Sequence, residues 1–357
     1  MKSTKNDRLL SLDVLRGADL MLLLAVQPVL WHWLPMVDAP WSRFLMDQLT
    51  HCTWEGFRLE DLIMPLFLFM AGASMPFSFS KYENRPQKEL WIKIIRRTLI
   101  LFVLGMVVQG NLLTLDPHRF TLYVNTLQSI GIGYLVSSIL QLTLRPKAQI
   151  GATLALLLVY WIPMTFCGDW TVEGNFAYKV DEFLMGSWRG DLAYTWIWSS
   201  LTFAVSVQLG AFAGMIVRNT NVTPRNRFLQ LLAIGVALCI ASWLWSFQMP
   251  IIKHIWTCSM TLLAAGYSFL LLALFYGWID ALGHRKGWLW FKVFGVNSIV
   301  AYMLGELVNF RSIGESLLYG LQPLLGEGYP VLITLSNSLV LCGILYAMYK
   351  AKIFLKI

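Results

Sequence analysis

Charged residues are scarce in this 357-residue sequence, and their scarcity excludes an ordinary soluble protein. Asp, Glu, Lys and Arg make up 13% of the chain and hydrophobic residues 57%, whereas a soluble domain has about 25% charged and about 45–50% apolar residues. A soluble chain of this length needs more polar surface to remain dissolved. The 16 Trp and 13 Tyr suit a protein with two interfaces between water and lipid. The sequence therefore predicts an integral membrane protein whose main partner is the lipid bilayer.

Other features are absent too, and each absence narrows the class. The five cysteines have no C-x-x-C spacing, so no metal site is expected. The first apolar stretch contains Asp13, Arg16 and Asp19 and has no small-residue cleavage site after it, so we do not expect a signal peptide. No linker or low-complexity tract divides the sequence. Residues 1–357 are therefore expected to form a single transmembrane domain.

Long apolar runs indicate the fold class. A helix that crosses the hydrocarbon needs about 20 mostly apolar residues, and continuous rather than alternating runs favour helices over a membrane barrel. We predict an all-α helical bundle with about ten transmembrane helices. The expected ranges are Ser11–Leu34, Leu59–Phe79, Ile94–Leu113, Tyr123–Leu144, Ile150–Met164, Ala193–Val217, Phe228–Trp245, Trp256–Ile279, Phe291–Val308 and Pro330–Met348.

Positive charge falls on alternate sides of these predicted helices. With the N-terminus in the cytoplasm, about three quarters of the 28 Lys and Arg residues lie in inner segments, as the positive-inside rule requires. The inner set includes Lys2, Lys5 and Arg8 at one end and Lys356 at the other. Both termini are therefore predicted to be cytoplasmic. The net charge of +8 reports topology, and no nucleic-acid partner is expected.

The densest polar cluster lies at the outer mouth of the second predicted helix, from His51 to Leu62, with Pro65 following. Ionisable groups at this depth are costly and usually face a polar cavity. The unperturbed pKa of histidine, about 6.5, allows proton transfer near neutral pH, so His51 is the natural general base. A structural or interfacial histidine is the alternative. Asp61 likewise has two interpretations, as a partner of the imidazole or as a brace of the bundle.

Two further polar patches lie near the ends of the sequence. Asp13 and Arg16 are three residues apart, so they can pair on one helical face, either as a structural ion pair or as part of a cytoplasmic pocket. The ninth predicted helix contains Asn297 and Ser298, which can hydrogen-bond between helices, and Glu306 near its outer end.

The outer loops leave two questions open. The longest, Thr165–Leu192, is either a functional loop or a plain solvated connector. Cys52 and Cys167 both fall on the predicted outer side, either as a disulfide or as two separate small residues.

These motifs together resemble a family of transmembrane acyltransferases related to heparan-α-glucosaminide N-acetyltransferase. The resemblance covers most of the chain, and the sequence of Asp61–Phe69 is most similar to that of a bacterial subgroup. The matching landmarks, in order, are Ser11–Gly17 (SLDVLRG), His51-x-x-Trp54-x-Gly56, Asp61-Leu62 with Pro65, Leu127-Gln128, and Gly295-x-Asn297-Ser298-Ile299.

The resemblance implies a reaction and a location. Family members take acetyl-CoA from the cytoplasm and acetylate a sugar on the other side of the membrane, and their catalytic histidine corresponds to His51. We therefore expect a multi-pass protein of a bacterial inner membrane that transfers acetyl from acetyl-CoA to an amino sugar or a glycan hydroxyl. A homodimer is a further expectation.

Roles for the remaining residues follow from the resemblance and from their predicted side of the membrane. His51 and Asp61 are the expected catalytic pair. Expected contacts to the acceptor or to the developing oxyanion are Gln27, Trp54, Glu55, Asn297, Ser298 and Glu306. Expected contacts to CoA, whose phosphates suit arginine, are Lys93, Arg96, Arg97, Asp13, Arg16 and Gln128. Ordinary positive-inside anchoring is the alternative for the three cations of the third predicted helix.

The sequence departs from the family pattern at three places. It has Gln27 followed by Pro28 where the family tends to carry Asn, Ser129 where Arg is frequent, and Gly305 where a His precedes the Glu. A second hypothesis is therefore a transporter of an amino sugar or oligosaccharide, because Pro28 and Pro65 interrupt early helices as in many transporters. A structural or complex-forming subunit is a third hypothesis, and it gives no reason for the cluster around His51.

Overall fold

The computed structural model of the chain describes residues 9–110, 112–113, 115–116, 118–190 and 193–355. Within these ranges the regular secondary structure is helical, and the one β-type pairing is an isolated bridge between Glu55 and Ile252. The predicted all-α fold class is confirmed. The positively charged positions Lys2, Lys5, Arg8 and Lys356 lie outside the described residues.

Seven helical stretches within the described ranges are long and apolar enough to cross a membrane, so the prediction of a polytopic helical protein is confirmed. They are Leu10–Met36, Leu59–Tyr82, Pro146–Phe166, Ser200–Arg218, Pro224–Ser246, Cys258–Ala281 and Arg311–Lys350. The other three predicted ranges are also helical, in α6 (Gln87–Val108), α7 (Thr126–Thr143) and the pair α13 (Leu289–Val296) and α14 (Ser298–Leu307). The count of ten and the side on which the termini lie stay predictions.

The chain divides into two compact units, which we describe separately. The first contains Met1–His51, Arg58–Ile63 and Trp278–Ile357, and the second contains Cys52–Phe57 and Met64–Gly277. The helix α4 (Leu59–Ala73) contributes its first turn to the first unit and the rest to the second.

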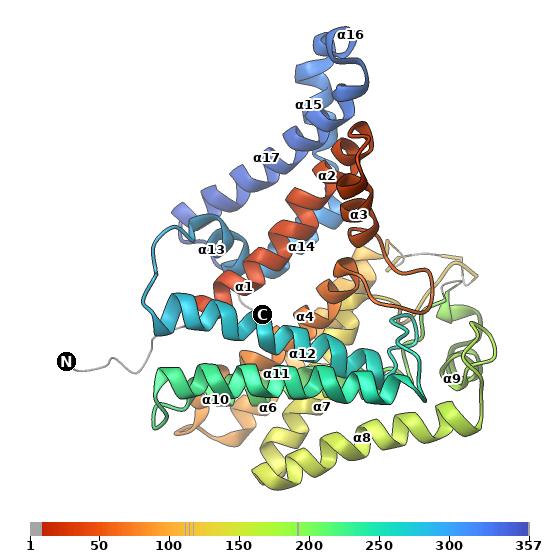
Figure 1. Cartoon of the computed structure of the whole chain (residues 1–357), viewed down its shortest axis with the longest axis vertical. Helices are drawn as coiled ribbons and strands as arrows, with labels where there is room; N and C mark the ends of the chain where they lie inside the picture. The colour runs from red at the N-terminus through yellow and green to blue at the C-terminus, as the bar shows by residue number, and fades with distance from the viewer. Residues whose placement is uncertain (1–8, 111, 114, 117, 191–192, 356–357) are drawn as a thin grey trace. The chain divides into compact units, whose positions relative to one another are not determined.

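The first unit is built around its N-terminal helix. α1 (Leu10–Met21) continues through a π-helical stretch, Leu22–Val26, into α2 (Gln27–Trp33). α13 packs closely on α1 (Figure 1) because glycines occupy the crossing. A Cβ on Gly17 would lie 1.6 Å from the carbonyl oxygen of Phe291, and one on Gly295 would lie 1.9 Å from that of Asp13. The remaining helices of this unit are α3 (Pro40–Gln48), α15 (Arg311–Leu318), α16 (Gln322–Leu325) and α17 (Tyr329–Lys350).

One predicted span of the first unit is broken in the structure. The range Phe291–Val308 was expected to be continuous, but α13 ends and α14 begins at Asn297, which lies outside helical geometry at φ −114° and ψ 40°. The Asn297 side chain donates to the carbonyl of Ile353 (2.9 Å) and accepts from the amide of Leu355 (3.2 Å). These bonds attach the C-terminal segment to the break.

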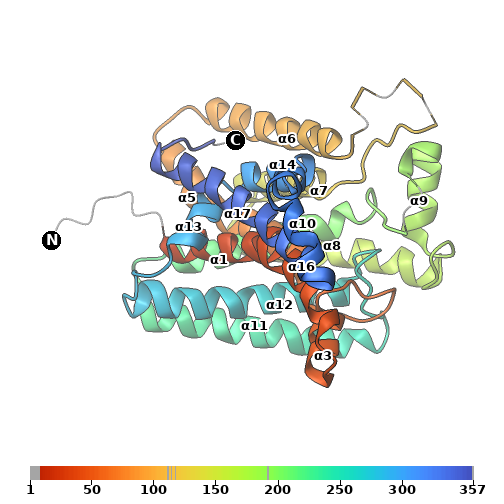
Figure 2. The same cartoon turned by 90° about the horizontal axis from the view of Figure 1, so that it is seen from above.

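The second unit surrounds α10 (Ser200–Arg218), which contacts α5 (Met75–Phe79), α7, α8 (Pro146–Phe166) and α12 (Cys258–Phe275). Glycines again allow close approach, because a Cβ on Gly210 would lie 1.9 Å from the carbonyl oxygen of Phe69 on α4. α11 (Pro224–Ser246) runs beside α12 in both views (Figures 1 and 2). The segment between α8 and α10 carries α9 (Phe176–Met185).

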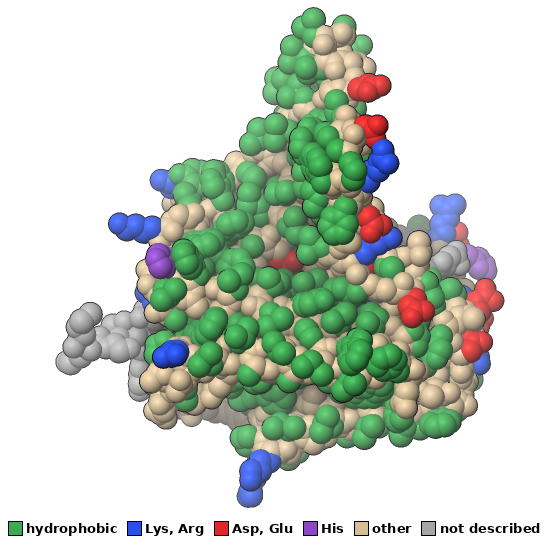
Figure 3. All heavy atoms as spheres, in the orientation of Figure 1, with side chains coloured by type: hydrophobic (Ala, Val, Ile, Leu, Met, Phe, Trp, Pro, Cys, Tyr) green, Lys and Arg blue, Asp and Glu red, His purple; other side chains and the backbone are tan. Residues whose placement is uncertain are grey.

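The surface of α11 indicates its solvent. The most apolar part of this helix is only 17% buried within the protein. Leu232, Val236, Ile240 and Trp243 are among its exposed side chains. Figure 3 shows hydrophobic side chains spread over this helix. An apolar helix that its neighbours do not cover needs lipid rather than water as its solvent.

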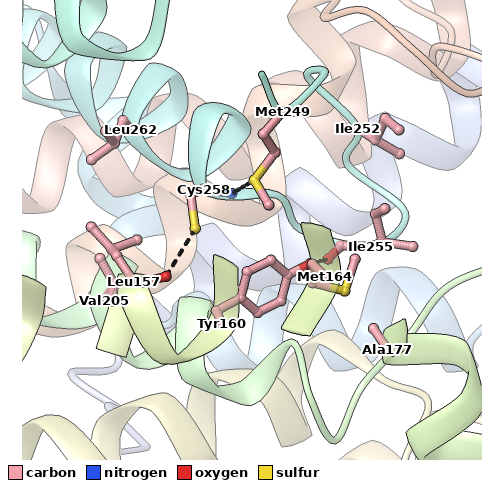
Figure 4. Packing of buried hydrophobic residues seen from close by; sticks show 10 residues of the cluster. All are labelled: Leu157, Tyr160, Met164, Ala177, Val205, Met249, Ile252, Ile255, Cys258 and Leu262. Carbon is pink, nitrogen blue, oxygen red and sulfur yellow. Dashed lines mark hydrogen bonds between the residues drawn. The ribbon is translucent and has the colours of Figure 1, made fainter. Parts of the chain in front are cut away.

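A compact apolar cluster joins α8, α10 and α12 within the second unit (Figure 4). Tyr160 is fully buried there, and its hydroxyl donates to the carbonyl of Ile255. The Cys258 thiol donates to the carbonyl of Leu157 (3.4 Å). These two polar groups of the cluster are thus paired, as burial requires.

Candidate active site

His51 lies in the segment between α3 and α4, and Asp61 lies in the first turn of α4. Asp61 Oδ2 accepts the backbone N–H of Arg58 (3.1 Å), so the carboxylate is placed at the N-terminal end of the helix, where a negative charge is favourable. Its other oxygen, Oδ1, lies 3.0 Å from Nδ1 of His51. The Asp61 side chain is 1% exposed and that of His51 is 46% exposed. The structure therefore brings the expected catalytic pair into direct contact.

This contact sets the tautomer of the neutral imidazole. A carboxylate can only accept hydrogen bonds, so the proton of neutral His51 resides on Nδ1 and the lone pair on Nε2. Nε2 lies 4.0 Å from Oε1 of Glu60. The nitrogen that can take a proton thus faces a second carboxylate, whose side chain is 8% exposed.

Arg58 holds the segment that carries His51. Its guanidinium forms an ion pair with Asp47 on α3 (2.7 Å) and donates to the carbonyl of His51 (2.9 Å) and to the hydroxyl of Thr50 (3.0 Å). Several directional bonds from one planar group restrict the segment more than a single ion pair does.

Gln27, the first residue of α2, fixes the position of Glu60. Its side-chain Nε2 donates to Oε2 of Glu60 (2.5 Å) and to the carbonyl of Leu49 (3.0 Å). The reverse orientation of the amide would place its oxygen against two acceptors, so the hydrogen-bond network settles which end is nitrogen. Both N–H groups are used, and Oε1 has no partner among the described residues. Gln27 therefore offers a ligand an acceptor, not the donor that we expected for an oxyanion.

A cavity of about 250 Å³ opens beside these groups. Its polar lining comes from Gln27, Glu60, Glu306 and Asn337. Gly305 also lines it, and a Cβ there would meet only the flexible end of Leu24, at 2.6 Å. Two of the three departures from the family pattern, Gln27 and Gly305, thus lie in one cavity. The carboxylates and the free amide oxygen suit a ligand that donates N–H or O–H bonds.

Comparison with known proteins shows a relation to one family. The family model described as heparan-alpha-glucosaminide N-acetyltransferase, catalytic, matches residues 8–179. The heparan-alpha-glucosaminide N-acetyltransferase of Homo sapiens is 23% identical over 365 residues, which cover 84% of this chain and 53% of the human protein. The Mus musculus protein of the same name is 22% identical over 327 residues, covering 72% of this chain and 49% of its own length. The chain is related to this family.

The relation to the heparan-alpha-glucosaminide N-acetyltransferases confirms the resemblance drawn from the motifs. The chain spans about half the length of these curated relatives. The matched region contains Gln27, His51, Glu60 and Asp61, whereas Glu306 lies beyond it.

Glu60 is a site residue that the sequence alone did not indicate. Glu60 is next to Asp61 in sequence, but adjacent residues on a helix point in different directions. A role for Asp61 therefore did not imply a role for Glu60. The usable signal was a second carboxylate in the first turn of a membrane helix, where charge is costly without a polar surrounding.

The other residues of the first unit that were expected at the site come from α1, from α14 and from the break before α14. Asn297 gives its amide to the C-terminal backbone, and Ser298 begins α14. Asp13 is buried on α1, and Arg16 on the same helix is half-buried. Asn297 and Ser298 do not line the cavity, whereas Glu306 does.

Expected residues of the second unit have structural contacts of their own. The Trp54 indole donates to the carbonyl of Trp170 (2.7 Å) and stacks on His254 at 5.4 Å between ring centroids. Glu55 forms the isolated bridge with Ile252. The pair Cys52 and Cys167 is not a disulfide, because both cysteines are free thiols.

Three cations near the start of α6 were expected to bind CoA. Lys93 donates to the hydroxyl of Ser78 (2.5 Å), and the Arg97 guanidinium lies over the Tyr134 ring, 4.4 Å from its centroid. Arg96 is exposed. Such positions leave positive charge available at this end of the helix.

Gln128 was also expected to contact CoA, and the structure gives it a helix-capping role. Its Oε1 accepts from the amides of Val124 and Asn125 (3.0 Å each), and its Nε2 donates to the carbonyl of Leu122 (2.8 Å). Asn125 completes a capping box at the start of α7. No group of three His, Cys, Asp or Glu residues in the described ranges is placed to hold a metal ion.

Proposed function

We propose that this protein is a transmembrane acyltransferase that moves an acetyl group from cytoplasmic acetyl-CoA to a sugar on the periplasmic side of a bacterial inner membrane. The observation that carries the proposal is the contact of 3.0 Å between His51 Nδ1 and the buried Asp61 carboxylate. Both residues lie in the region matched by the catalytic family model. The seven apolar helices support the membrane setting.

Proton transfer at His51 follows from this geometry. Asp61 holds the proton of Nδ1, so Nε2 can remove a proton from the acceptor amine or hydroxyl as it attacks the thioester carbonyl. The nitrogen then returns the proton to the departing thiolate of CoA. The same Nε2 can alternatively attack the thioester and be acetylated transiently before the acceptor takes the acetyl group. Both routes require an unprotonated Nε2, which Asp61 orients.

The acceptor is proposed to donate hydrogen bonds to the cavity. Glu60, Glu306 and the free oxygen of Gln27 accept hydrogen bonds, which suits the N–H and O–H groups of an amino sugar or glycan hydroxyl. Trp54, Glu55, Asn297 and Ser298 remain proposed acceptor residues from the resemblance.

The donor is proposed to bind by its phosphates near the cytoplasmic surface. Lys93, Arg96 and Arg97 supply positive charge for them, and Asp13, Arg16 and Gln128 stay assigned to CoA by resemblance. Cytoplasmic termini and a homodimer complete the proposal.

Calorimetric titration of the purified protein in detergent with acetyl-CoA tests the proposal, with His51→Ala measured in parallel. Submillimolar binding by both forms, followed by release of free CoA thiol from wild type with an amino sugar, supports an acyltransferase. Absence of binding by a folded wild type would refute it. Sugar uptake into vesicles without CoA would then identify the transporter.

A further inference from the structure

The carboxylate of Glu60 is anchored more firmly than a lone side chain at a cavity wall. Gln27 donates to Glu60 Oε2 at 2.5 Å, and the second N–H of the same amide is held by the carbonyl of Leu49 at 3.0 Å. Gln27 is itself 1% exposed. These two bonds fix the position and orientation of the Glu60 carboxylate.

The anchored charge points at the reacting nitrogen of His51. Oε1 of Glu60, the oxygen that Gln27 does not hold, lies 4.0 Å from Nε2. Asp61 occupies Nδ1 on the other edge of the ring. The imidazole is thus placed between two carboxylates, and the distance to Glu60 leaves space for the proton that Nε2 acquires.

We propose that Glu60, held in place by Gln27, is a positioning residue whose carboxylate stabilises the protonated form of the His51 imidazole. The proposal rests on the proposed function for its meaning, because there Nε2 takes a proton from the acceptor. An anion next to the developing imidazolium lowers the energy of that charge. Glu60 acts on the reaction through His51 and forms no bond to the acetyl group.

The other charged groups around the imidazole define the background against which Glu60 acts. Within the first unit, Asp61 binds Nδ1, and Arg58 bonds the His51 carbonyl while paired with Asp47. Glu306 lies on the wall of the same cavity. Asp19 of α1, whose Oδ2 has no partner among the described residues, repels the charge of Glu60.

The reaction of each histidine with diethyl pyrocarbonate measures the protonation of His51 without turnover. The reagent modifies the neutral imidazole, so the rate at the His51 peptide, followed by mass spectrometry between pH 5 and 8, gives a pH midpoint. The purified full-length protein is used without substrate. The other four histidines of the chain serve as internal references in each sample.

Glu60→Gln should lower the pH midpoint of His51, because an opposite charge within about 4–6 Å favours the charged form. Glu60→Asp, which keeps the charge but withdraws it, should lower it less. Gln27→Leu should also give a smaller shift in the same direction. Glu315→Gln, which removes an exposed carboxylate paired with Arg311, is the matched control and should leave the midpoint unchanged.

Two results would overturn the inference. The first is an unchanged midpoint in both Glu60 variants, with monodisperse protein and unchanged reference histidines. The second is an equal shift in Glu306→Gln, which would assign the effect to the general charge of the cavity rather than to Glu60. Because no acetyl transfer is measured, a failure of the proposed function leaves this result unaffected, and the reverse also holds.

Discussion

Two buried aspartates of this protein, Asp61 in the first unit and Asp181 in the second, use their carboxylates differently. Both are nearly inaccessible, at 1% and 2% exposure. The two carboxylate oxygens of Asp181 accept hydrogen bonds from the backbone amides of Trp196 (2.6 Å) and Ile197 (3.0 Å). In Asp61, one oxygen accepts a hydrogen bond from the backbone amide of Arg58, and the other binds the imidazole of His51.

The difference separates a carboxylate with a structural role from one that can take part in chemistry. Backbone amides cannot change protonation, so the bonds of Asp181 fix a chain path. An imidazole can gain and lose a proton near neutral pH, so the bond of Asp61 controls a titratable group. Burial and residue type are the same in both cases, and the partner decides the role.

Removal of the imidazole breaks the comparison most severely. His51→Ala should reduce acetyl transfer by about 10³-fold or more, because a positioned base contributes roughly 10²–10⁴-fold and an acetyl-histidine route would be lost altogether. The measurement is release of CoA thiol from acetyl-CoA with an amino sugar. The variant should still insert into membranes and elute as a monodisperse species. Turnover at the wild-type rate would remove His51 from the mechanism.

Asp61→Asn tests the partner rather than the base. The amide can still accept at one position, but it can also present N–H to Nδ1 and so favour the wrong tautomer, and we expect a loss of about 10²-fold in kcat. The KM for acetyl-CoA should change little, because the donor site is elsewhere in the proposal. Unchanged kcat would mean that Asp61, like Asp181, is only structural.

Much of the helical framework was predictable from composition. The run Phe228–Trp245, for example, contains no charged residue, and this predicted span lies inside α11 (Pro224–Ser246). The sequence did not indicate where α10 begins. The helix was predicted from Ala193, and it begins at Ser200. Asp181 takes the amides of Trp196 and Ile197, so these residues stay outside the helix. A bond between residues 15 and 16 positions apart leaves no local signal.

The site was predictable in its residue types but not in its contacts. His51 and Asp61 stood out because a histidine and a carboxylate flanked an apolar run. Gln27 was expected as a donor, and only the structure shows that Glu60 and Leu49 consume its N–H groups. Gln128 was selected by resemblance, whereas its hydrogen bonds at the start of α7 account for its burial. Pairings of this kind depend on the folded backbone.

Gln128→Leu sharpens the comparison, because Gln128 resembles Asp181 in binding only backbone. The variant leaves the carbonyl of Leu122 and two amides without their partner, and we expect a loss of about 2 kcal/mol in the free energy of unfolding. Denaturant unfolding in detergent measures this loss. Because the resemblance assigns Gln128 to CoA, acetyl-CoA should raise the stability of the variant by a smaller increment than that of wild type. An equal increment would leave Gln128 with the capping role alone.

The smallest expected effect is a dependence of stability on pH at Asp181, which lies on α9, between the apolar helices α8 and α10. Burial raises the pKa of this carboxyl to about 6, and hydrogen bonds from Trp196 and Ile197 oppose the rise. In the unfolded chain the pKa of Asp is about 3.9. Between these values the folded protein binds the extra proton, so its stability falls as pH rises through 6 and is favoured at lower pH.

The corresponding gain on acidification from pH 7 to pH 5 is about 1 kcal/mol by proton linkage. Asp181→Asn cannot ionise, so its melting temperature in detergent should lack this component, whereas wild type should show it. Glu182→Gln, next in sequence and on the exposed side of α9, is the matched control and should retain the wild-type pH dependence. Equal pH dependence in wild type and Asp181→Asn would show that Asp181 is ionised throughout this range, and that a carboxylate bonded only to backbone amides stays charged despite its burial.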